Sequence, residues 1–204
     1  EKLKEDLQLF LNSEDWYKER DIPYTRGYLF YGYPGTGKTS MIKGISLYCK
    51  RHIHFLILSN VSSDAELFDL LKRINYKDTI LVIEDIDAMI DTVKSRDDAT
   101  PNANNSDKDD DKDKNKDKNK DKNKDNEKQS GGTLSGILNA IDGVFSCNGR
   151  ILIMTTNHPE VLDKALLRPG RIDMNYLFDN CTREQIGELY QMFFNKTADI
   201  NKLK

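Results

Sequence analysis

The sequence contains few cysteines, no long apolar run and little excess charge of either sign. Three Cys among 204 residues, far apart in the chain, argue against a disulfide framework and for reduced thiols in an intracellular protein. No apolar run exceeds four residues, so we expect no transmembrane helix within this chain. A net charge of −3 argues against a nucleic-acid-binding module held by phosphate contacts. No signal peptide opens the chain and its first residue is not Met, so we expect a fragment of a longer protein.

Charge is concentrated in one segment. Residues 107–128 consist only of Lys, Asp, Glu and Asn, and the other 182 residues carry 22 basic and 25 acidic side chains. That remainder has the charged fraction of an ordinary globular domain and suffices for one core. The wider stretch 94–132 is almost free of large apolar residues, so we predict a long disordered, low-complexity insertion. We favour a tolerated insertion over a polyampholyte tether for a partner.

Five short apolar runs predict strands, and amphipathic segments between them predict helices. The runs are residues 28–31, 55–59, 80–83, 151–155 and 176–178. Their apolar residues are mostly consecutive rather than alternating, which is expected when both faces of a parallel sheet are covered. The alternation of strands and helices therefore predicts an α/β fold with a five-stranded parallel sheet flanked by helices.

Helix boundaries are predicted by capping residues and apolar spacing. Residues 63–66 and 182–185 each begin with Ser or Thr and end with Glu or Gln, the pattern of a capping box. Apolar residues at helical spacing over 134–141 predict a helix that Gly143 would end. An amphipathic helix near the start predicts an N-terminal linker helix within 1–22. It lacks a basic face, so we expect it to pack on the main domain rather than on a membrane.

The most specific motif directly follows the first predicted strand and opens a predicted helix. It fits G-x-x-x-x-G-K-[ST] at every fixed position, in the context that distinguishes a P-loop from a chance match. Its glycines let backbone N–H groups curl around phosphates. Lys38 is expected to reach the β- and γ-phosphates, and the Thr39 hydroxyl to help hold Mg²⁺. We therefore predict an ATP site formed by Gly32, Tyr33, Pro34, Gly35, Thr36, Gly37, Lys38, Thr39 and Ser40.

Polar side chains follow the third and fourth predicted strands. Glu84 and Asp85 end the third, where one carboxylate can orient the metal and another can position or deprotonate the attacking water. Asn157 ends the fourth and is a candidate to hydrogen-bond the γ-phosphate or that water. Arg168 and Arg171, stiffened by the Pro-Gly between them, are either surface charges or groups that act on developing phosphoryl charge.

Taken in order, these motifs resemble those of AAA ATPases. The resemblance covers nearly all of residues 14–195 apart from the insertion. The resemblance is strongest to the mitochondrial AAA chaperone-translocases that assemble the Rieske protein into respiratory complex III. The segments of this chain that look like that branch are 16–17, 22–29, 84–87 and 155–158. It implies an AAA ATPase core over 23–180 and the start of a truncated helical lid over 181–204.

The resemblance also implies roles for single residues. Asn157 would be the γ-phosphate sensor, and Arg168 and Arg171 would be fingers that reach the neighbouring subunit's nucleotide, which requires a homo-oligomeric ring. Most AAA proteins have Asp-Glu after the third strand, whereas this chain has the reverse order. Glu84 would therefore take the metal-side position, and the shorter Asp85 would be the catalytic base.

At the level of the whole protein, the resemblance implies Mg²⁺-dependent ATP hydrolysis that drives chaperone-like remodelling or translocation of protein cargo. The mitochondrial inner membrane is the expected location if the full-length protein matches this branch, with the membrane contacted only through residues absent from this chain. No aromatic-apolar-Gly tripeptide lies between the second and third predicted strands, which argues against simple threading of extended polypeptide.

Other functions are less consistent with the sequence. The Glu-Asp order leaves open a nucleotide-binding AAA scaffold with little or no hydrolysis. A GTPase would need an Asn-Lys-x-Asp motif, and a DNA-loading ATPase a basic surface, and neither is found. His52 and His54 share one face of a strand-like segment, but no third ligand is evident, so we disfavour a metal site there.

Overall fold

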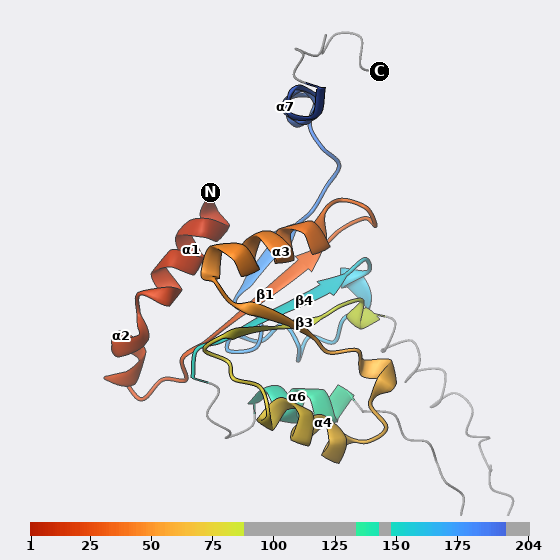
Figure 1. Cartoon of the computed structure of the whole chain (residues 1–204). Helices are drawn as coiled ribbons and strands as arrows, with labels where there is room; N and C mark the ends of the chain where they lie inside the picture. The colour runs from red at the N-terminus through yellow and green to blue at the C-terminus, as the bar shows by residue number, and fades with distance from the viewer. Residues whose placement is uncertain (88–133, 143–147, 195–204) are drawn as a thin grey trace, which may run out of the picture.

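A wholly parallel five-stranded sheet forms the centre of the molecule, as predicted (Figure 1). The computed structural model describes residues 1–87, 134–142 and 148–194. The strand order is β2-β3-β4-β1-β5, and the strands are β1 Thr25–Tyr31, β2 His52–Phe55, β3 Thr79–Ile83, β4 Arg150–Thr156 and β5 Met174–Leu177. Because neighbouring strands run in the same direction, the carboxyl ends of β1, β3 and β4 meet at one edge of the sheet.

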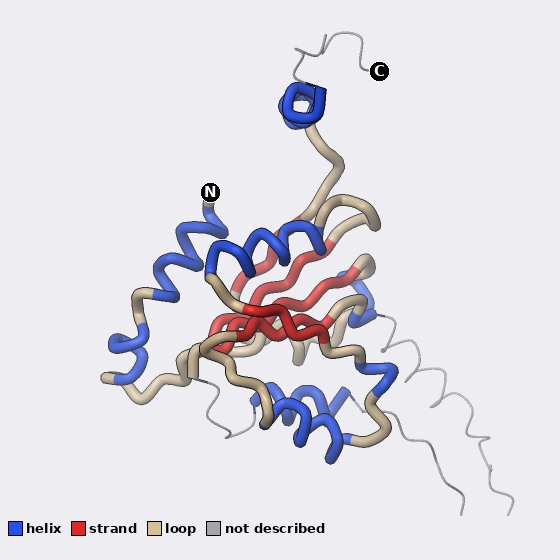
Figure 2. The backbone as a smooth tube through the Cα atoms, in the orientation of Figure 1, coloured by secondary structure: helices blue, strands red, loops and turns tan. Residues whose placement is uncertain are grey.

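Helices cover both faces of this sheet. In Figures 1 and 2, α1 and α3 lie over one face, and α4 and α6 lie side by side over the other. The helices are α1 Lys2–Leu11, α2 Glu14–Lys18, α3 Lys38–Cys49, α4 Asp64–Lys72, α6 Leu134–Asp142 and α7 Arg183–Phe194, with 3₁₀ turns at Leu58–Asn60 and Pro159–Val161. Every residue of β4 is therefore buried, which explains its run of consecutive apolar residues.

The core consists of two apolar clusters separated by the sheet. One joins the α1 and α3 side chains to the sheet and includes Leu7, Phe10, Tyr28, Phe30 and Ile42. The other joins α4 and α6 to the opposite face and includes Leu67, Leu71, Leu81, Ile137 and Ile141. Side chains of β3 and β4 alternate between the two clusters, so these central strands tie the layers together.

The N-terminal helix packs on the main domain, as expected. Leu7 and Phe10 are 2% and 3% exposed, and the Asp6 carboxylate accepts hydrogen bonds from Arg26 Nε at 3.0 Å and Tyr28 Oη at 2.7 Å. Burial and the Asp6 hydrogen bond raise the pKa of Tyr28 far above its ordinary value. Within the described residues, no helix is long and apolar enough to cross a membrane.

Both predicted N-terminal caps form, one as a complete capping box and one with a shifted carboxylate bond. Ser63 Oγ accepts the Glu66 amide at 3.3 Å, and the Glu66 carboxylate accepts an amide one residue earlier than the usual pattern, from Ser62 at 2.8 Å. Thr182 and Gln185 make the reciprocal pair at 2.9 and 3.3 Å. The second box opens α7, which projects away from the sheet in Figure 1 and has no buried residue in the described structure.

Strand boundaries were wrong at the two edges of the sheet. The second strand is His52–Phe55 rather than 55–59, and the fifth is Met174–Leu177 rather than 176–178. Edge strands are exposed along one side and tolerate polar residues, so a search for continuous apolar runs misplaces them. The predicted continuation of this strand to residue 59 is replaced by a 3₁₀ turn at Leu58–Asn60, after which Val61 is buried in the core. The predicted insertion at 94–132 and the expected helix stop at Gly143 lie outside the described residues.

Candidate active site

The glycine-rich loop connects the end of β1 to the start of α3, as the motif requires. Gly32 has φ 138°, and a Cβ added there would lie 2.0 Å from the Phe178 carbonyl oxygen. Glycine at this position therefore allows the backbone just after β1 to lie against the backbone just after β5. Gly35 and Gly37 have φ 82° and 97°, and among the described residues no atom lies within 4 Å of an added Cβ. These two positions need glycine for backbone conformation and leave the loop open for a ligand.

Lys38 links this loop to the end of β4. The residue is only 8% exposed, and its Nζ donates to the carbonyls of Gly32 at 2.7 Å and Tyr33 at 2.9 Å, and to Asn157 Oδ1 at 2.8 Å. A buried ammonium needs such oxygen partners. The same donors can bind phosphate oxygens, so the predicted phosphate-binding cation and the predicted sensor are in direct contact.

The two carboxylates after β3 face different partners. Glu84 Oε1 accepts the Thr39 hydroxyl at 2.9 Å, which unites the two residues predicted to hold the metal. Asp85 Oδ1 lies 3.4 Å from Asn157 Nδ2, a long contact. The structure therefore brings the P-loop, Glu84, Asp85 and Asn157 to one edge of the sheet.

Hydroxyl groups at the end of β4 complete this arrangement and were not assigned a role from the sequence. Thr155 Oγ1 accepts the Asp85 amide at 3.1 Å. Thr156 Oγ1 donates to Asp87 Oδ1 at 2.7 Å and accepts the His158 amide at 2.9 Å. Asp87 is 8% exposed, which explains why its carboxylate requires a donor. The sequence did contain a signal for these roles, because Thr155 and Thr156 are two polar residues at the end of an apolar strand that is buried throughout.

The two arginines lie apart from this group. Arg171 Nε donates to Asp142 Oδ1 at 2.8 Å, and its guanidinium also contacts Asp142 Oδ2 and the Ala165 carbonyl. The hydrogen bond from Arg171 lowers the pKa of Asp142, and that of Arg171 is raised by the same pair. Arg168 is exposed, and its carbonyl accepts the Arg171 amide at 3.1 Å.

The backbone around the arginines is fastened to the first half of β1. Asp173 accepts the amides of Gly27 at 2.8 Å and Gly170 at 3.0 Å. A Cβ on Gly27 would lie 1.7 Å from the Arg171 carbonyl oxygen, so only glycine permits this close approach. Because the P-loop follows the opposite end of β1, the arginine segment and the P-loop lie at different ends of that strand.

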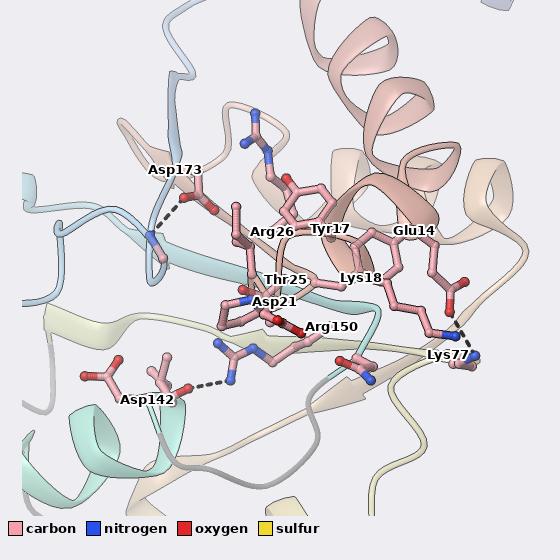
Figure 3. A pocket seen from close by; sticks show the side chains of 16 residues that line it. Glu14, Tyr17, Lys18, Asp21, Thr25, Arg26, Lys77, Asp142, Arg150 and Asp173 are labelled. Atoms are coloured by element: carbon pink, nitrogen blue, oxygen red, sulfur yellow. Dashed lines mark hydrogen bonds and ion pairs between the residues drawn. The ribbon is translucent and has the colours of Figure 1, made fainter.

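A cavity of about 940 Å³ lies at the amino-terminal ends of the strands (Figure 3). Its lining includes Glu14, Arg26, Asp142, Arg150 and Asp173. Acidic and basic side chains are mixed, and none of the lining residues belongs to the P-loop or to the carboxylates after β3. We therefore do not assign the nucleotide to this cavity. The described residues, those of the cavity included, contain no group of three or more His, Cys, Asp or Glu placed to hold a metal.

The fold and the site together define a P-loop nucleoside-triphosphate-binding domain. A phosphate-binding loop ends one central strand, carboxylates end the next but one, and a polar amide ends the strand between them. The cationic donor and the open glycine backbone fit phosphate, and the paired hydroxyl and carboxylate fit Mg²⁺.

Comparison with known proteins identifies the family. The ATPase family associated with various cellular activities (AAA) matches residues 28–180, so the chain belongs to the AAA ATPases. An AAA family ATPase of Acanthamoeba polyphaga mimivirus, L572, is 52% identical over 159 residues, which cover 78% of this chain and 81% of the relative. The mitochondrial chaperone BCS1 of Bos taurus is 36% identical over 194 residues, covering 95% and 41%. AAA-ATPase At1g43910 of Arabidopsis thaliana is 44% identical over 182 residues, covering 88% and 36%.

These relatives confirm the resemblance to the mitochondrial chaperone branch. The chain spans about four fifths of the viral relative but only about two fifths of the bovine and plant proteins. The family match over residues 28–180 is therefore the part of this chain that the bovine and plant relatives share within much longer proteins.

Proposed function

We propose that this chain is the ATP-hydrolysing core of a ring-forming AAA ATPase that remodels or translocates protein cargo. One observation carries the proposal: Lys38 Nζ lies 2.8 Å from Asn157 Oδ1, and Thr39 Oγ1 lies 2.9 Å from Glu84 Oε1. These two contacts join the P-loop to the ends of β4, which pairs with β1, and of β3, the next strand beyond it. Groups from three segments of the sequence thereby converge where a triphosphate can be both bound and attacked.

The proposed roles follow from chemistry and position. Lys38 exchanges its carbonyl partners for phosphate oxygens and stabilises charge on the transferred group. Asn157 lies beside Lys38 and Asp85 and orients the γ-phosphate or the attacking water. Asp85 accepts a proton from that water while the water oxygen attacks the γ-phosphorus. The bond between the γ-phosphorus and the oxygen that bridges it to the β-phosphate breaks, which gives ADP and phosphate.

Thr39 and Glu84 are the residues that would hold Mg²⁺. Their contact places a hydroxyl and a carboxylate oxygen side by side, the hard oxygen donors that this cation prefers. Bound Mg²⁺ would neutralise charge on the phosphate oxygens. Glu84 is exposed at the sheet edge, so its carboxylate would be free to turn toward a bound cation.

Arg168 and Arg171 are proposed to act on the neighbouring subunit's nucleotide. Both belong to a segment fastened to the first half of β1, whereas the P-loop follows its other end. A ring in which this segment meets the next subunit's P-loop would complete each site in trans. Arg171→Ala is expected to lower kcat on the order of 10³-fold in the assembled ring. Normal hydrolysis by that variant would refute its role.

The division of the chain follows the same proposal. Residues 1–22 form the linker, 23–180 the ATPase core and 181–204 the start of a lid. Protein cargo and a mitochondrial inner-membrane location are proposed because relatives are named mitochondrial chaperones. Cell fractionation of the tagged full-length protein tests the location, and recovery outside mitochondria would refute it.

The decisive test of hydrolysis uses Asp85→Asn in the assembled full-length protein. The amide keeps the size of the side chain but cannot take a proton, so kcat is expected to fall about 10²–10⁴-fold. ATP binding should persist, because Lys38 and the P-loop are unchanged. Asp69→Asn, on the exposed surface of α4, is the matched control and should hydrolyse ATP normally.

A non-hydrolysing nucleotide-binding scaffold is the second candidate. It is favoured by one observation: Asp85 is short, and within the described residues the hydrogen bond of its carboxylate is a long one, 3.4 Å to Asn157. ATP binding without turnover in the unaltered protein, with Asp85→Asn indistinguishable from it, would support the scaffold and refute hydrolysis.

A further inference from the structure

Thr155 carries a buried hydroxyl near the end of β4, directly after four buried apolar residues of that strand. Residues Ile151–Met154 are at most 1% exposed, and Thr155 itself is 2% exposed. A hydroxyl is costly at such a position unless it is hydrogen-bonded.

The Thr155 hydroxyl accepts a backbone amide at the point where the hydrogen-bonded pairing of β3 with β4 ends. The last paired residues of these strands are Ile83 and Met154. Beyond them β3 leaves the sheet, and Asp85 adopts a left-handed backbone with φ 48°, which is uncommon for a residue other than glycine. Its amide cannot continue the ladder and instead donates to Thr155 Oγ1 at 3.1 Å. This bond ties the strained residue to the strand that carries Asn157.

The backbone at Asp85 controls where its carboxylate points. Only one methylene separates that carboxylate from Cα, so a shift of the backbone moves the oxygens almost equally. In the structure Oδ1 faces Asn157 Nδ2 at 3.4 Å, and Asn157 Oδ1 accepts Lys38 Nζ at 2.8 Å. The neighbouring hydroxyl, on Thr156, serves different partners, Asp87 and His158.

We propose that Thr155 is a positioning residue for hydrolysis: by accepting the Asp85 amide, it holds the left-handed backbone that aims the Asp85 carboxylate at the reacting group. The inference rests on the proposed function, since it takes Asp85 as the base. It also gives a physical basis for the reversed Glu-Asp order. The shorter carboxylate compensates for limited reach by having its backbone fixed to β4.

The test compares Thr155→Val with Thr155→Ser in the assembled full-length protein. Valine keeps the shape and removes the acceptor, whereas serine keeps the acceptor. For Thr155→Val, kcat is expected to fall about tenfold while KM for ATP stays within about threefold. Thr155→Ser should recover kcat to within about threefold of the unaltered protein. Thermal unfolding of each variant checks the fold, and Thr155→Ala replaces valine if the latter does not fold.

A second measurement separates positioning from a general structural effect. Because Thr155 is proposed to act through Asp85, adding Thr155→Val to Asp85→Asn should lower kcat no further than about twofold. An additional tenfold loss in that background would overturn the inference.

Failure of the inference and failure of the proposed function give different results. If Asp85→Asn abolishes hydrolysis but Thr155→Val is normal, the inference alone is overturned. If valine and serine are equally impaired, the hydroxyl is not responsible and the inference is overturned as well. If Asp85→Asn hydrolyses ATP normally, the proposed base is wrong, and the inference fails with it.

Discussion

Gly27 offers a stringent test of how the arginine segment is fastened to the sheet. Replacing it with Ala adds a Cβ 1.7 Å from the Arg171 carbonyl oxygen, whereas real Cβ contacts essentially never fall below 3.0 Å. The obstructing atom belongs to the backbone and cannot rotate away. The segment must therefore move by more than about 1 Å, a displacement that a close-packed protein resists.

The energetic cost can be estimated from the bonds at that point. Gly27 exchanges two hydrogen bonds with Asp173, one to the carboxylate and one from the backbone amide, each 2.8 Å long. Weakening both costs about 1–3 kcal/mol, and overpacking adds about 1–3 kcal/mol. We expect Gly27→Ala to lose about 2–6 kcal/mol of the free energy of unfolding, a large part of a typical 5–15 kcal/mol.

Urea unfolding followed by circular dichroism measures this loss, with Gly44→Ala as the matched control. Gly44 lies within α3, and an added Cβ there would meet no atom within 4 Å in the part of the chain that the structure describes. Alanine favours a helix over glycine, so the control should gain about 0.5–1 kcal/mol. A loss below about 1 kcal/mol for Gly27→Ala, at an unchanged dependence on urea, would refute the steric reasoning.

Three further predictions concern Lys38 as the proposed phosphate-binding residue, the helix caps, and the ion pair between Arg171 and Asp142. Lys38→Met should weaken binding of a fluorescent ATP analogue with Mg²⁺ at least about tenfold, and unchanged affinity would contradict the site. Ser63→Ala should cost about 1 kcal/mol in urea unfolding, because it removes a cap from a helix that packs on the core. Thr182→Ala should cost less, since α7 has no buried residue in the described structure, and equal losses would refute this argument. The pKa of Asp142 is lowered in the folded protein by its hydrogen bond to Arg171, so the pair stabilises above the unfolded pKa of about 3.9 and loses this effect as pH falls through the folded pKa. Asp142→Asn should therefore be less stable at pH 7, by less than about 1 kcal/mol given its exposure of 49%, and the difference should vanish in acid. A difference independent of pH would contradict the assignment.

The arginine segment illustrates how structural and proposed catalytic roles can share one residue. Arg171 is bound to Asp142 within its own chain, and its side chain is only 12% exposed. In the proposed ring it must reach the next subunit's nucleotide. The Asp142→Asn variant is therefore informative about assembly as well as about stability, and its ATPase activity as a ring is worth measuring beside that of Arg171→Ala.

Local chemistry made much of this protein predictable from its sequence. Glycine and lysine at fixed spacing, between a predicted strand and a predicted helix, are enough to predict a phosphate-binding loop. Ser63 and Thr182 mark helix starts because their hydroxyls bond within three residues. The central strands were found because burial on both faces demands continuous apolar residues, and the edge strands were misplaced because that demand is relaxed there.

Tertiary structure decided the contacts between residues distant in the sequence. Nothing local indicates that Thr155 bonds the Asp85 amide, that Arg171 pairs with Asp142, or that Gly27 must admit the Arg171 backbone. Such contacts depend on strand order and register, which follow from packing of the whole sheet rather than from the propensities of neighbouring residues. The positions of the predicted strand ends were enough to expect Lys38, Glu84, Asp85 and Asn157 at the carboxyl edge of the sheet, but not the Thr155 and Thr156 hydroxyls. Only the folded chain decided how those groups are held, because their orientation is set by hydrogen bonds that form once the strands lie side by side.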